Sequence, residues 1–323
     1  VQARPELLPF PLCAFACDLP SDSHASNRLV FPFIALARSA RFAYHPAAMV
    51  LSSKTVGLGL LAAAALGLRV WVVLALTAKH AAPLDYEHGQ IAQNLLAGRG
   101  FSIEFLGAEG PTSQQAPFYP LLLAAFYWCF GGATPAAVLA VQLLQCVAGT
   151  VLVLAVAWLG WSLLPDRPGI GSLAAIAAAV YPTHVYMVTH LQVALWAALV
   201  LTLLLAVVAS PRWQTSRRGA ILAGCLAGCL LLIEPILALA LPICAAVLFL
   251  AGRGARRVRL CVRDQSESQC RPAILGPFAR VAVMAGVAAA IVTPWILRNW
   301  AVHGQPVFVK STFGYAFWQG NNP

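Results

Sequence analysis

Two carboxylates and a histidine lie within four residues at the start of the most polar stretch of this sequence, DYEHGQIAQNLLAGRGFS (residues 85–102). Side chains such as Asp85 and Glu87 act as general bases toward a hydroxyl group, or hold a divalent cation against a phosphate. The stretch directly follows the first long apolar run, so both are expected at a lipid surface, where they meet lipid-borne head groups. A second interpretation stays open, because Asp85 also suits the N-cap of a helix that Gly98 ends.

Two further charged residues stand beside apolar runs. Glu234 precedes Pro235 between two such runs, and a carboxylate at membrane depth is costly enough to suggest a function. Alternatively, Glu234 lies in a hydrated turn that ends one helix before the proline. Arg298 follows the last apolar run, where a guanidinium either meets phosphate oxygens or anchors the helix at the interface. The sequence leaves both pairs of alternatives open.

The composition places these residues in a membrane protein. Of 323 residues, 60% are hydrophobic and 10% are charged, against roughly 25% charged in an average soluble domain. No water-soluble fold hides so much apolar surface. The formal net charge of +10 comes from basic residues in short segments between apolar runs, which favours membrane orientation over nucleic-acid binding. Five of the nine cysteines fall within or beside apolar runs, so we predict neither a disulfide framework nor a zinc site.

The element that must position these residues is a helical bundle. Residues 1–48 are predicted to be a disordered N-terminal tail or a gene-model extension, and residues 49–323 the membrane domain. Spanning a bilayer takes about 20 apolar residues in a helix. Pro117–Phe130 is aromatic but short, and is predicted to be a helix lying in the interface. The predicted spans are Val56–Ala78, Ala136–Leu159, Ile170–Val188, Val193–Ala209, Ala220–Ile233, Pro235–Ala251 and Val281–Leu297. The fold class is therefore all-α, a polytopic transmembrane bundle of about seven spans with a large first outer loop that contains interfacial helices.

The basic residues predict the orientation of this bundle. Sixteen of the 21 Lys and Arg residues then fall on the cytoplasmic side and four on the outer side, as the positive-inside rule requires. If Pro117–Phe130 crossed the membrane, the later basic loops would face outward instead. With this orientation Asp85, Glu87 and Glu234 gather on the outer side or at its membrane edge, together with the histidines that follow the tail.

Three segments, in a fixed order, carry a resemblance to a known family. They are residues 85–102, QQAPFYPLLLAAFYWCFG (114–131) and TPWILRNWAVHGQPVFVKSTFGYAFWQGNNP (293–323). They resemble the bacterial polyprenyl-phosphate-sugar-dependent membrane glycosyltransferases of glycosyltransferase family 39, which are related to protein O-mannosyltransferases and have the GT-C fold. The similarity runs from about residue 55 to the end and covers roughly half to two-thirds of a family member. It implies that the family pattern continues beyond Pro323.

The resemblance implies an enzyme of the cytoplasmic (inner) membrane with its active site on the extracytoplasmic side. Such an enzyme moves a hexosyl or pentosyl group from a polyprenyl-phosphate donor to a lipid, glycan or protein acceptor. The resemblance also implies that Asp85 or Glu87 is catalytic. The family's acidic pair is adjacent, whereas Tyr86 separates the two here. Residues two apart on a helix point about 200° apart, so only one faces a given site, and Asp85 is slightly preferred.

The family's second outer loop often supplies an acidic residue that helps hold a metal. In the matching segment YPTHVYMVTHLQVALW (181–196), Gln192 stands where that acid is expected. A divalent cation, Mg²⁺ or Mn²⁺, is the one cofactor expected, and its ligands stay unknown. His184 and His190 are six apart, which does not place two ligands on one helical face. The expected partners are the sugar donor, the acceptor and membrane lipids, without nucleic acid. The predicted substrate-binding residues are His88, His190, Gln192, Glu234 and Arg298.

In the mechanism that this resemblance implies, the catalytic carboxylate deprotonates or orients an acceptor hydroxyl, which attacks the anomeric carbon while phosphate leaves. Arg298 and a divalent ion then offset the developing charge, and a single displacement inverts the sugar. The alternative is a membrane transporter or flippase for a lipid-linked or small polar substrate, with Arg69 and Glu234 as translocation groups. Transporters often carry internal repeats, and the sequence shows none.

Overall fold

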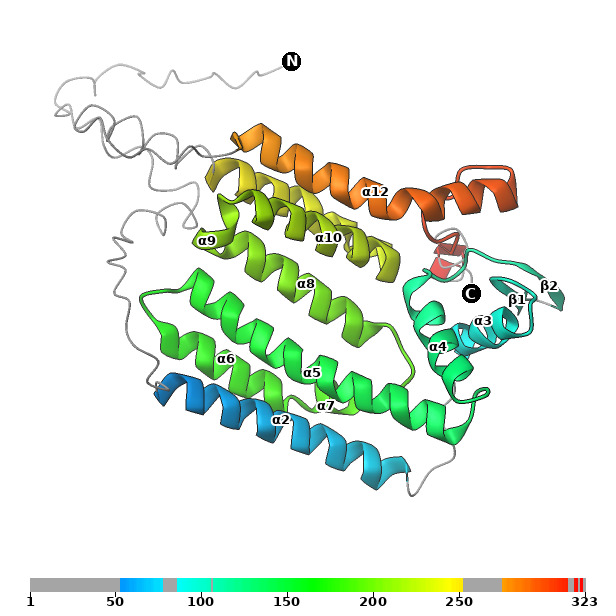
Figure 1. The fold of residues 1–323 in the computed structure, drawn as a ribbon, viewed down its shortest axis with the longest axis horizontal. Coiled ribbons are helices and arrows are strands. Elements are labelled where there is room, and N and C mark those ends of the chain that lie inside the picture. The colour runs from blue at the N-terminus through cyan, green and yellow to red at the C-terminus, as the bar shows by residue number, and fades with distance from the viewer. Residues whose placement is uncertain are drawn as a thin grey trace, which may run out of the picture. The chain divides into compact units, whose positions relative to one another are not determined.

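The computed structural model describes residues 53–77, 86–105, 107–251, 275–312, 317–318 and 320–321, all within the compact unit Met49–Pro323. This part of the chain is mostly helical, as the sequence predicts (Figure 1). Residues 1–48, Asp85 and the arginine-rich segment 253–271 lie outside the described residues. The predictions made for them, including the disordered tail, therefore stay predictions.

Three described helices are long and apolar enough to cross a membrane: α2 (Ser53–Thr77), α5 (Pro135–Leu163) and α12 (Pro277–His303). The other predicted spans fall on helices of 17 residues or fewer. These are α6 (Pro168–Val180), α8 (Ala194–Ala209), α10 (Arg217–Ile233) and Pro235–Ala251, which opens with the 3₁₀ helix η1 (Pro235–Ala240). A bundle of membrane-spanning character is therefore supported, whereas seven spans stay a prediction.

The predicted span Ile170–Val188 is wrong as a single helix. α6 ends at Val180, Tyr181 is extended at ψ 116°, and the short helix α7 (Pro182–Met187) then begins. Proline has no N–H and disfavours the helical conformation in the residue before it, so Pro182 separates the two helices. The break leaves the last carbonyl groups of α6 without helical partners.

Arg69 from α2 supplies donors to that helix end. Its Nη1 donates to the carbonyl oxygens of Ala65 and Ala179 at 3.0 and 3.2 Å, and its Nη2 to that of Ala178 at 3.4 Å. The side chain is fully buried, and a Cβ added to Gly149 of α5 would lie 2.7 Å from Arg69 Nε. Arg69 therefore faces the bundle, and glycine at position 149 makes room for it.

Two glycines one turn apart bring α10 close to α12. A Cβ added to Gly224 would lie 2.7 Å from the Met284 carbonyl oxygen, and one added to Gly228 would lie 2.8 Å from Ile291 Cβ. Small residues at this spacing allow helix backbones to approach closely. The bundle then continues from α10 to α8, from α8 to α5, and from α5 to α6 and α2 (Figure 1).

The segments between α2 and α5 gather at one end of the bundle. They are α3 (Tyr86–Leu96), the strands β1 (Ser102–Phe105) and β2 (Ala108–Pro111), and α4 (Phe118–Cys129) (Figure 1). The strands pair antiparallel, with Ser102 opposite Pro111. They correct the all-α prediction: a short run with β-branched and aromatic residues turns at Gly107, whose φ of +79° suits glycine. The helix predicted for Pro117–Phe130 is present as α4, and its interfacial position stays a prediction.

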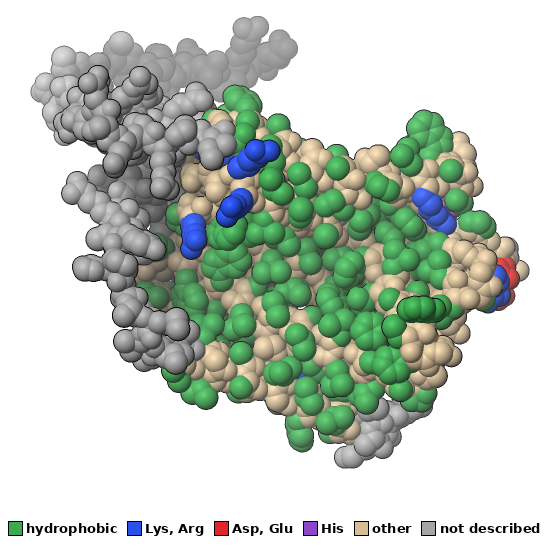
Figure 2. Space-filling model, in the orientation of Figure 1, with side chains coloured by type: hydrophobic (Ala, Val, Ile, Leu, Met, Phe, Trp, Pro, Cys, Tyr) green, Lys and Arg blue, Asp and Glu red, His purple; other side chains and the backbone are tan. Residues whose placement is uncertain are grey.

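The two ends of the bundle differ in charge. The end with α3, α4, β1 and β2 is called the pocket end below. At the opposite end, called the arginine end, α5 stops, α6 starts, α8 passes through α9 (Pro211–Gln214) into α10, and α12 begins. Its basic residues are Arg167, Arg212, Arg217, Arg218 and Arg280. Figure 2 shows Lys and Arg side chains gathered there, with hydrophobic side chains over the face between the ends.

Candidate active site

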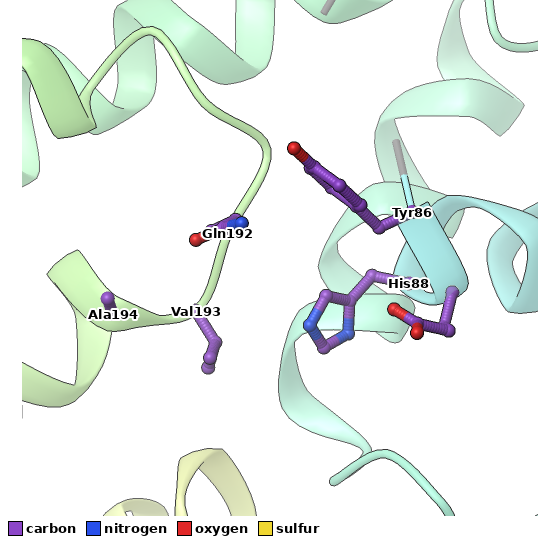
Figure 3. Close-up of a pocket in the computed structure, with 6 residues that line it drawn as sticks. Tyr86, His88, Gln192, Val193 and Ala194 are labelled. Carbon is purple, nitrogen blue, oxygen red and sulfur yellow. The ribbon is translucent and has the colours of Figure 1, made fainter. Parts of the chain in front are cut away.

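A pocket of about 180 Å³ opens at the pocket end, between two segments about 100 positions apart in the sequence. One wall is the first turn of α3, with Tyr86, Glu87 and His88, and the other is formed by Gln192, Val193 and Ala194 at the start of α8. Figure 3 shows Tyr86 and His88 pointing across the pocket toward Gln192 and Val193. Glu87, His88 and Gln192, three of the predicted site residues, therefore share one pocket.

The first wall rests on an amphipathic helix. α3 buries His88, Ile91, Ala92 and Asn94, a spacing that fits one helical face. Asn94 fixes the end of the helix, because its Nδ2 donates to the Ser102 carbonyl oxygen at 2.9 Å. Glu87, by contrast, is exposed at the rim. The predicted helix that ends before Gly98 is confirmed, and burial of its inner face determines which side chains reach the pocket.

Of the two predicted catalytic carboxylates, the structure describes only that of Glu87. α3 begins at Tyr86, directly after Asp85, which lies outside the described residues. The choice between capping and catalysis for Asp85 therefore stays open. Tyr86 has a φ of +46°, in the left-handed region, which costs a non-glycine residue roughly 1 to 2 kcal/mol. Tyr86 lines the pocket beside the exposed carboxylate of Glu87.

His88 is the most buried polar side chain of the pocket, with 8% of its surface exposed. Its Nδ1 has no hydrogen-bond partner within the described part of the chain. The ring lies edge-on to Tyr119 of α4, with the ring centroids 5.2 Å apart. Burial, with a smaller contribution from the charge of Lys310, lowers the pKa of His88 to about 4. The imidazole is therefore neutral at physiological pH and offers one donor and one acceptor.

The second wall is held by two glutamines inside the apolar helix α5. Nε2 of Gln142 donates to the Thr189 carbonyl oxygen at 2.8 Å. Nε2 of Gln145 donates to the carbonyl oxygens of Val188 and His190, both at 2.9 Å. These bonds fix the turns between α7 and α8, in the segment that carries Gln192. The sequence prediction missed both glutamines; the signal was two buried amides three residues apart in an apolar run.

Gln145 also connects to the first wall. The Tyr119 hydroxyl donates to Gln145 Oε1 at 2.7 Å, and the Tyr119 ring packs against His88. Burial raises the pKa of Tyr119 well above its usual range, so this hydroxyl stays a donor. Tyr119 and Gln145 are both fully buried. One amide in α5 therefore fixes both walls of the pocket.

His190, predicted to bind substrate, does not line this pocket. Its Nδ1 lies 3.0 Å from Thr189 Oγ1, and its ring packs against Tyr186 with centroids 4.5 Å apart. His184 packs similarly against Tyr181, with centroids 5.0 Å apart. Both histidines thus contact tyrosines of the α7 region, and a substrate-binding role for His190 stays a prediction.

Glu234 forms an ion pair with Lys310. Lys310 Nζ donates to Oε2 at 2.9 Å and to Oε1 at 3.1 Å, with the two side chains 17% and 25% exposed. Glu234 is the C-cap residue of α10, so the pair ties the segment after α12 to the break between α10 and η1. The turn interpretation of Glu234 accounts for its position, and Lys310 satisfies its charge.

Arg298 is a hydrogen-bond donor to the hairpin region. Nη1 donates to the Thr112 carbonyl oxygen at 2.7 Å and Nη2 to that of Phe101 at 3.0 Å. The guanidinium also lies over the rings of Phe101 and Trp295, 5.3 and 4.9 Å from their centroids. Its predicted phosphate contact stays a prediction, and these donors already have partners.

Around Arg298 lies a hydrogen-bonded group that the sequence prediction missed. Ser113 Oγ is 2.8 Å from Asn299 Oδ1 and 2.7 Å from His303 Nε2. Asn299 Nδ2 donates to the carbonyl oxygens of Val307 and Val309, both at 3.3 Å. Ser113 and Asn299 are fully buried and His303 is half-buried. The group joins the segment between β2 and α4, α12 and the segment after α12.

Within the described residues, no three His, Cys, Asp or Glu side chains lie close enough together to hold a metal ion. Asp85 lies outside this set, so the divalent cation and its ligands stay predictions. Comparisons with protein-family models, with curated proteins and with solved structures found no match to this chain.

Proposed function

We propose that this protein is an integral-membrane glycosyltransferase that takes a sugar from a polyprenyl-phosphate donor and passes it to a lipid, glycan or protein hydroxyl. The observation that carries the proposal is the pocket that places the exposed carboxylate of Glu87 beside the neutral groups His88 and Gln192. The described part of the chain also has three helices long and apolar enough to span a membrane. The resemblance of residues 85–102, 114–131 and 293–323 to glycosyltransferase family 39 supplies the reaction class.

The charge difference between the ends of the bundle supports the orientation. The arginine end carries the basic residues between the described helices, and positive residues favour the cytoplasmic side. The pocket end then faces the extracytoplasmic side of the cytoplasmic membrane. A donor whose polyprenyl chain stays in the outer leaflet presents its phosphate and sugar at this level.

In the proposed reaction, the carboxylate of Asp85 or Glu87 accepts the proton of the acceptor hydroxyl. The hydroxyl oxygen forms the new glycosidic bond at the anomeric carbon, while the bond from that carbon to the phosphate oxygen breaks and polyprenyl phosphate leaves. General-base catalysis of this kind contributes roughly 10² to 10⁴ in rate. A single displacement inverts the anomeric configuration.

The test measures transfer in membranes that contain the full chain and labelled polyprenyl-phosphate sugars. We expect Asp85→Asn or Glu87→Gln to lower transfer at least roughly 10²-fold. Glu104→Gln is the matched control, because Glu104 is an exposed carboxylate on β1 outside the pocket, and it should leave transfer unchanged. Full activity in both Asp85→Asn and Glu87→Gln contradicts the carboxylate assignment. Movement of the lipid-linked sugar across the bilayer without transfer would favour the transporter instead.

A further inference from the structure

The pocket between α3 and α8 is lined by groups that suit hydroxyls better than phosphate. A neutral imidazole, an amide and a phenol each both donate and accept hydrogen bonds, as sugar hydroxyls do. His88, Gln192 and Tyr86 are of these three types and come from both walls. A phosphate calls for charge-assisted donors such as Arg or Lys, and neither lines this pocket. The lining therefore matches the uncharged part of a donor.

The size of the pocket points the same way. Sites for drug-sized ligands run to roughly 300–1,000 Å³, whereas this pocket has about 180 Å³. It therefore suits a group of single-ring size. Val193 and Ala194 add apolar surface, against which the C–H face of a sugar ring can pack. The pocket is too small for a polyprenyl chain, which therefore stays in the lipid.

The buried imidazole of His88 gives an independent indication of a ligand. The side chain is 8% exposed, and Figure 3 shows it directed across the pocket toward Val193. Within the described chain its Nδ1 lacks a partner, although buried polar groups are nearly always hydrogen-bonded. The charged or titratable groups around it are Tyr86, Glu87, Tyr119 and Lys310, and none of them is hydrogen-bonded to it within the described residues.

We propose that this pocket is the sugar subsite of the donor, in which His88 and Gln192 hydrogen-bond sugar hydroxyls and Gln145 positions both of them. The inference rests on the proposed function and names the residues that recognise the sugar. Gln145 is a positioning residue because it does not reach the pocket lining. It acts through the Tyr119 hydroxyl on one wall and through the carbonyl oxygens of Val188 and His190 on the other.

The experiment measures binding of two lipids to the full chain in nanodiscs. One is bare polyprenyl phosphate, and the other is its mannosyl, glucosyl, galactosyl or arabinosyl ester, whichever the wild type transfers best. The sugar preference is the Kd for the bare lipid divided by the Kd for the ester. We expect His88→Phe and Gln192→Leu each to lower this preference about three- to tenfold, the usual effect of losing one hydrogen bond, with bare-lipid affinity unchanged.

His184→Phe is the matched control for His88. Both histidines pack edge-on to a tyrosine ring, but His184 does not line the pocket, so its substitution should keep the preference. Because His88 stays neutral, the wild-type preference should also be constant between about pH 5.5 and pH 8. Unchanged preference in both pocket variants, or an equal loss of affinity for both lipids, would overturn the subsite.

The positioning role has its own comparison. Gln145→Leu should lower the sugar preference about as much as the double variant His88→Phe/Gln192→Leu, whereas Gln142→Leu, which loses only the bond to Thr189, should lower it less. Tyr119→Phe keeps the ring but removes the bond to Gln145, so its effect should not add to that of Gln145→Leu. If Gln142→Leu and Gln145→Leu lower the preference equally, or if the effects of Tyr119→Phe and Gln145→Leu add fully, Gln145 has only a structural role.

The failure of this inference can be told apart from failure of the proposed function. A wild type that binds neither lipid contradicts the proposed function, and the subsite with it. A wild type that binds and transfers the sugar, but whose pocket variants retain the sugar preference, contradicts the subsite alone.

Discussion

The pocket and the group around Arg298 lie at the same end of the bundle and use their polar side chains in opposite ways. Arg298 donates to the carbonyl oxygens of Phe101 and Thr112, and neighbouring Asn299 donates to two more. His88 is more buried than Arg298, yet its Nδ1 lacks a partner in the described part of the chain. The comparison teaches that a polar side chain whose hydrogen bonds are all made within the protein stabilises the fold, whereas one at a pocket with an unpaired atom is available to a ligand.

The largest expected effect is on stability, from Arg298→Ala. The substitution leaves the Thr112 carbonyl oxygen without the Arg298 donor and removes one of the two donors to the Phe101 carbonyl oxygen, which we expect to cost about 4 kcal/mol in the free energy of unfolding. Thermal unfolding of the purified protein measures it. Arg298→Lys retains the charge without the planar fork and should recover only part of the loss. A stable Arg298→Ala protein that has lost binding of bare polyprenyl phosphate would reverse the comparison and make Arg298 a phosphate ligand.

The second effect is the pH dependence that His88 contributes. Its pKa is lowered to about 4 in the folded protein, against about 6.5 in the unfolded chain. Between these two pH values the unfolded chain binds a proton at His88 and the folded protein does not. The contribution of neutral His88 to the free energy of unfolding is therefore fully present above about pH 6.5 and declines as pH falls toward 4. The expected loss is up to about 3 kcal/mol.

Unfolding curves of the wild type and His88→Phe between pH 7 and pH 4 measure this difference. The variant should lose less stability on acidification than the wild type. Parallel curves for the two proteins would mean that His88 titrates normally, and the pocket would then hold a charged imidazole near pH 6.

The smallest expected effect is that of Lys310, which forms an ion pair with Glu234 and also lowers the pKa of His88. Lys310→Met removes the partner of Glu234 in a partly exposed ion pair, at a cost of about 1 kcal/mol. It also removes a charge that lowers the pKa of His88, so the acid transition of His88 should move to higher pH. Arg99→Met is the matched control, because the Arg99–Glu109 pair is about half exposed. If the acid transition does not move in Lys310→Met, the charge of Lys310 does not influence His88 in the pocket.

The sequence predicts the helices better than it predicts the contacts between them. Apolar runs suffice for α2, α5 and α12, and the polar amphipathic stretch suffices for α3, because both follow from local periodicity. The break at Pro182 was readable from the proline, but the apolar run around it hid the break. The β1–β2 hairpin was missed because its strands have only four residues each.

The site was predictable only where one segment carries it. Glu87 and His88 stand together in the sequence, whereas Gln192 was identified through the family resemblance. Gln142 and Gln145 gave too little signal, since their role depends on carbonyl groups more than 40 residues away. Arg298 was assigned to a ligand because its partners, Phe101 and Thr112, are nearly 200 residues earlier. Partners distant in the sequence decide whether a polar group is free.

Photo-cross-linking tests the central claim most directly. A polyprenyl-phosphate sugar with a diazirine on the sugar ring is bound to the full chain in nanodiscs and irradiated, and the labelled residues are identified by mass spectrometry. We predict labels on the first turn of α3 and on residues 192–194. Labelling confined to the Arg298 group or to the arginine end would contradict the account.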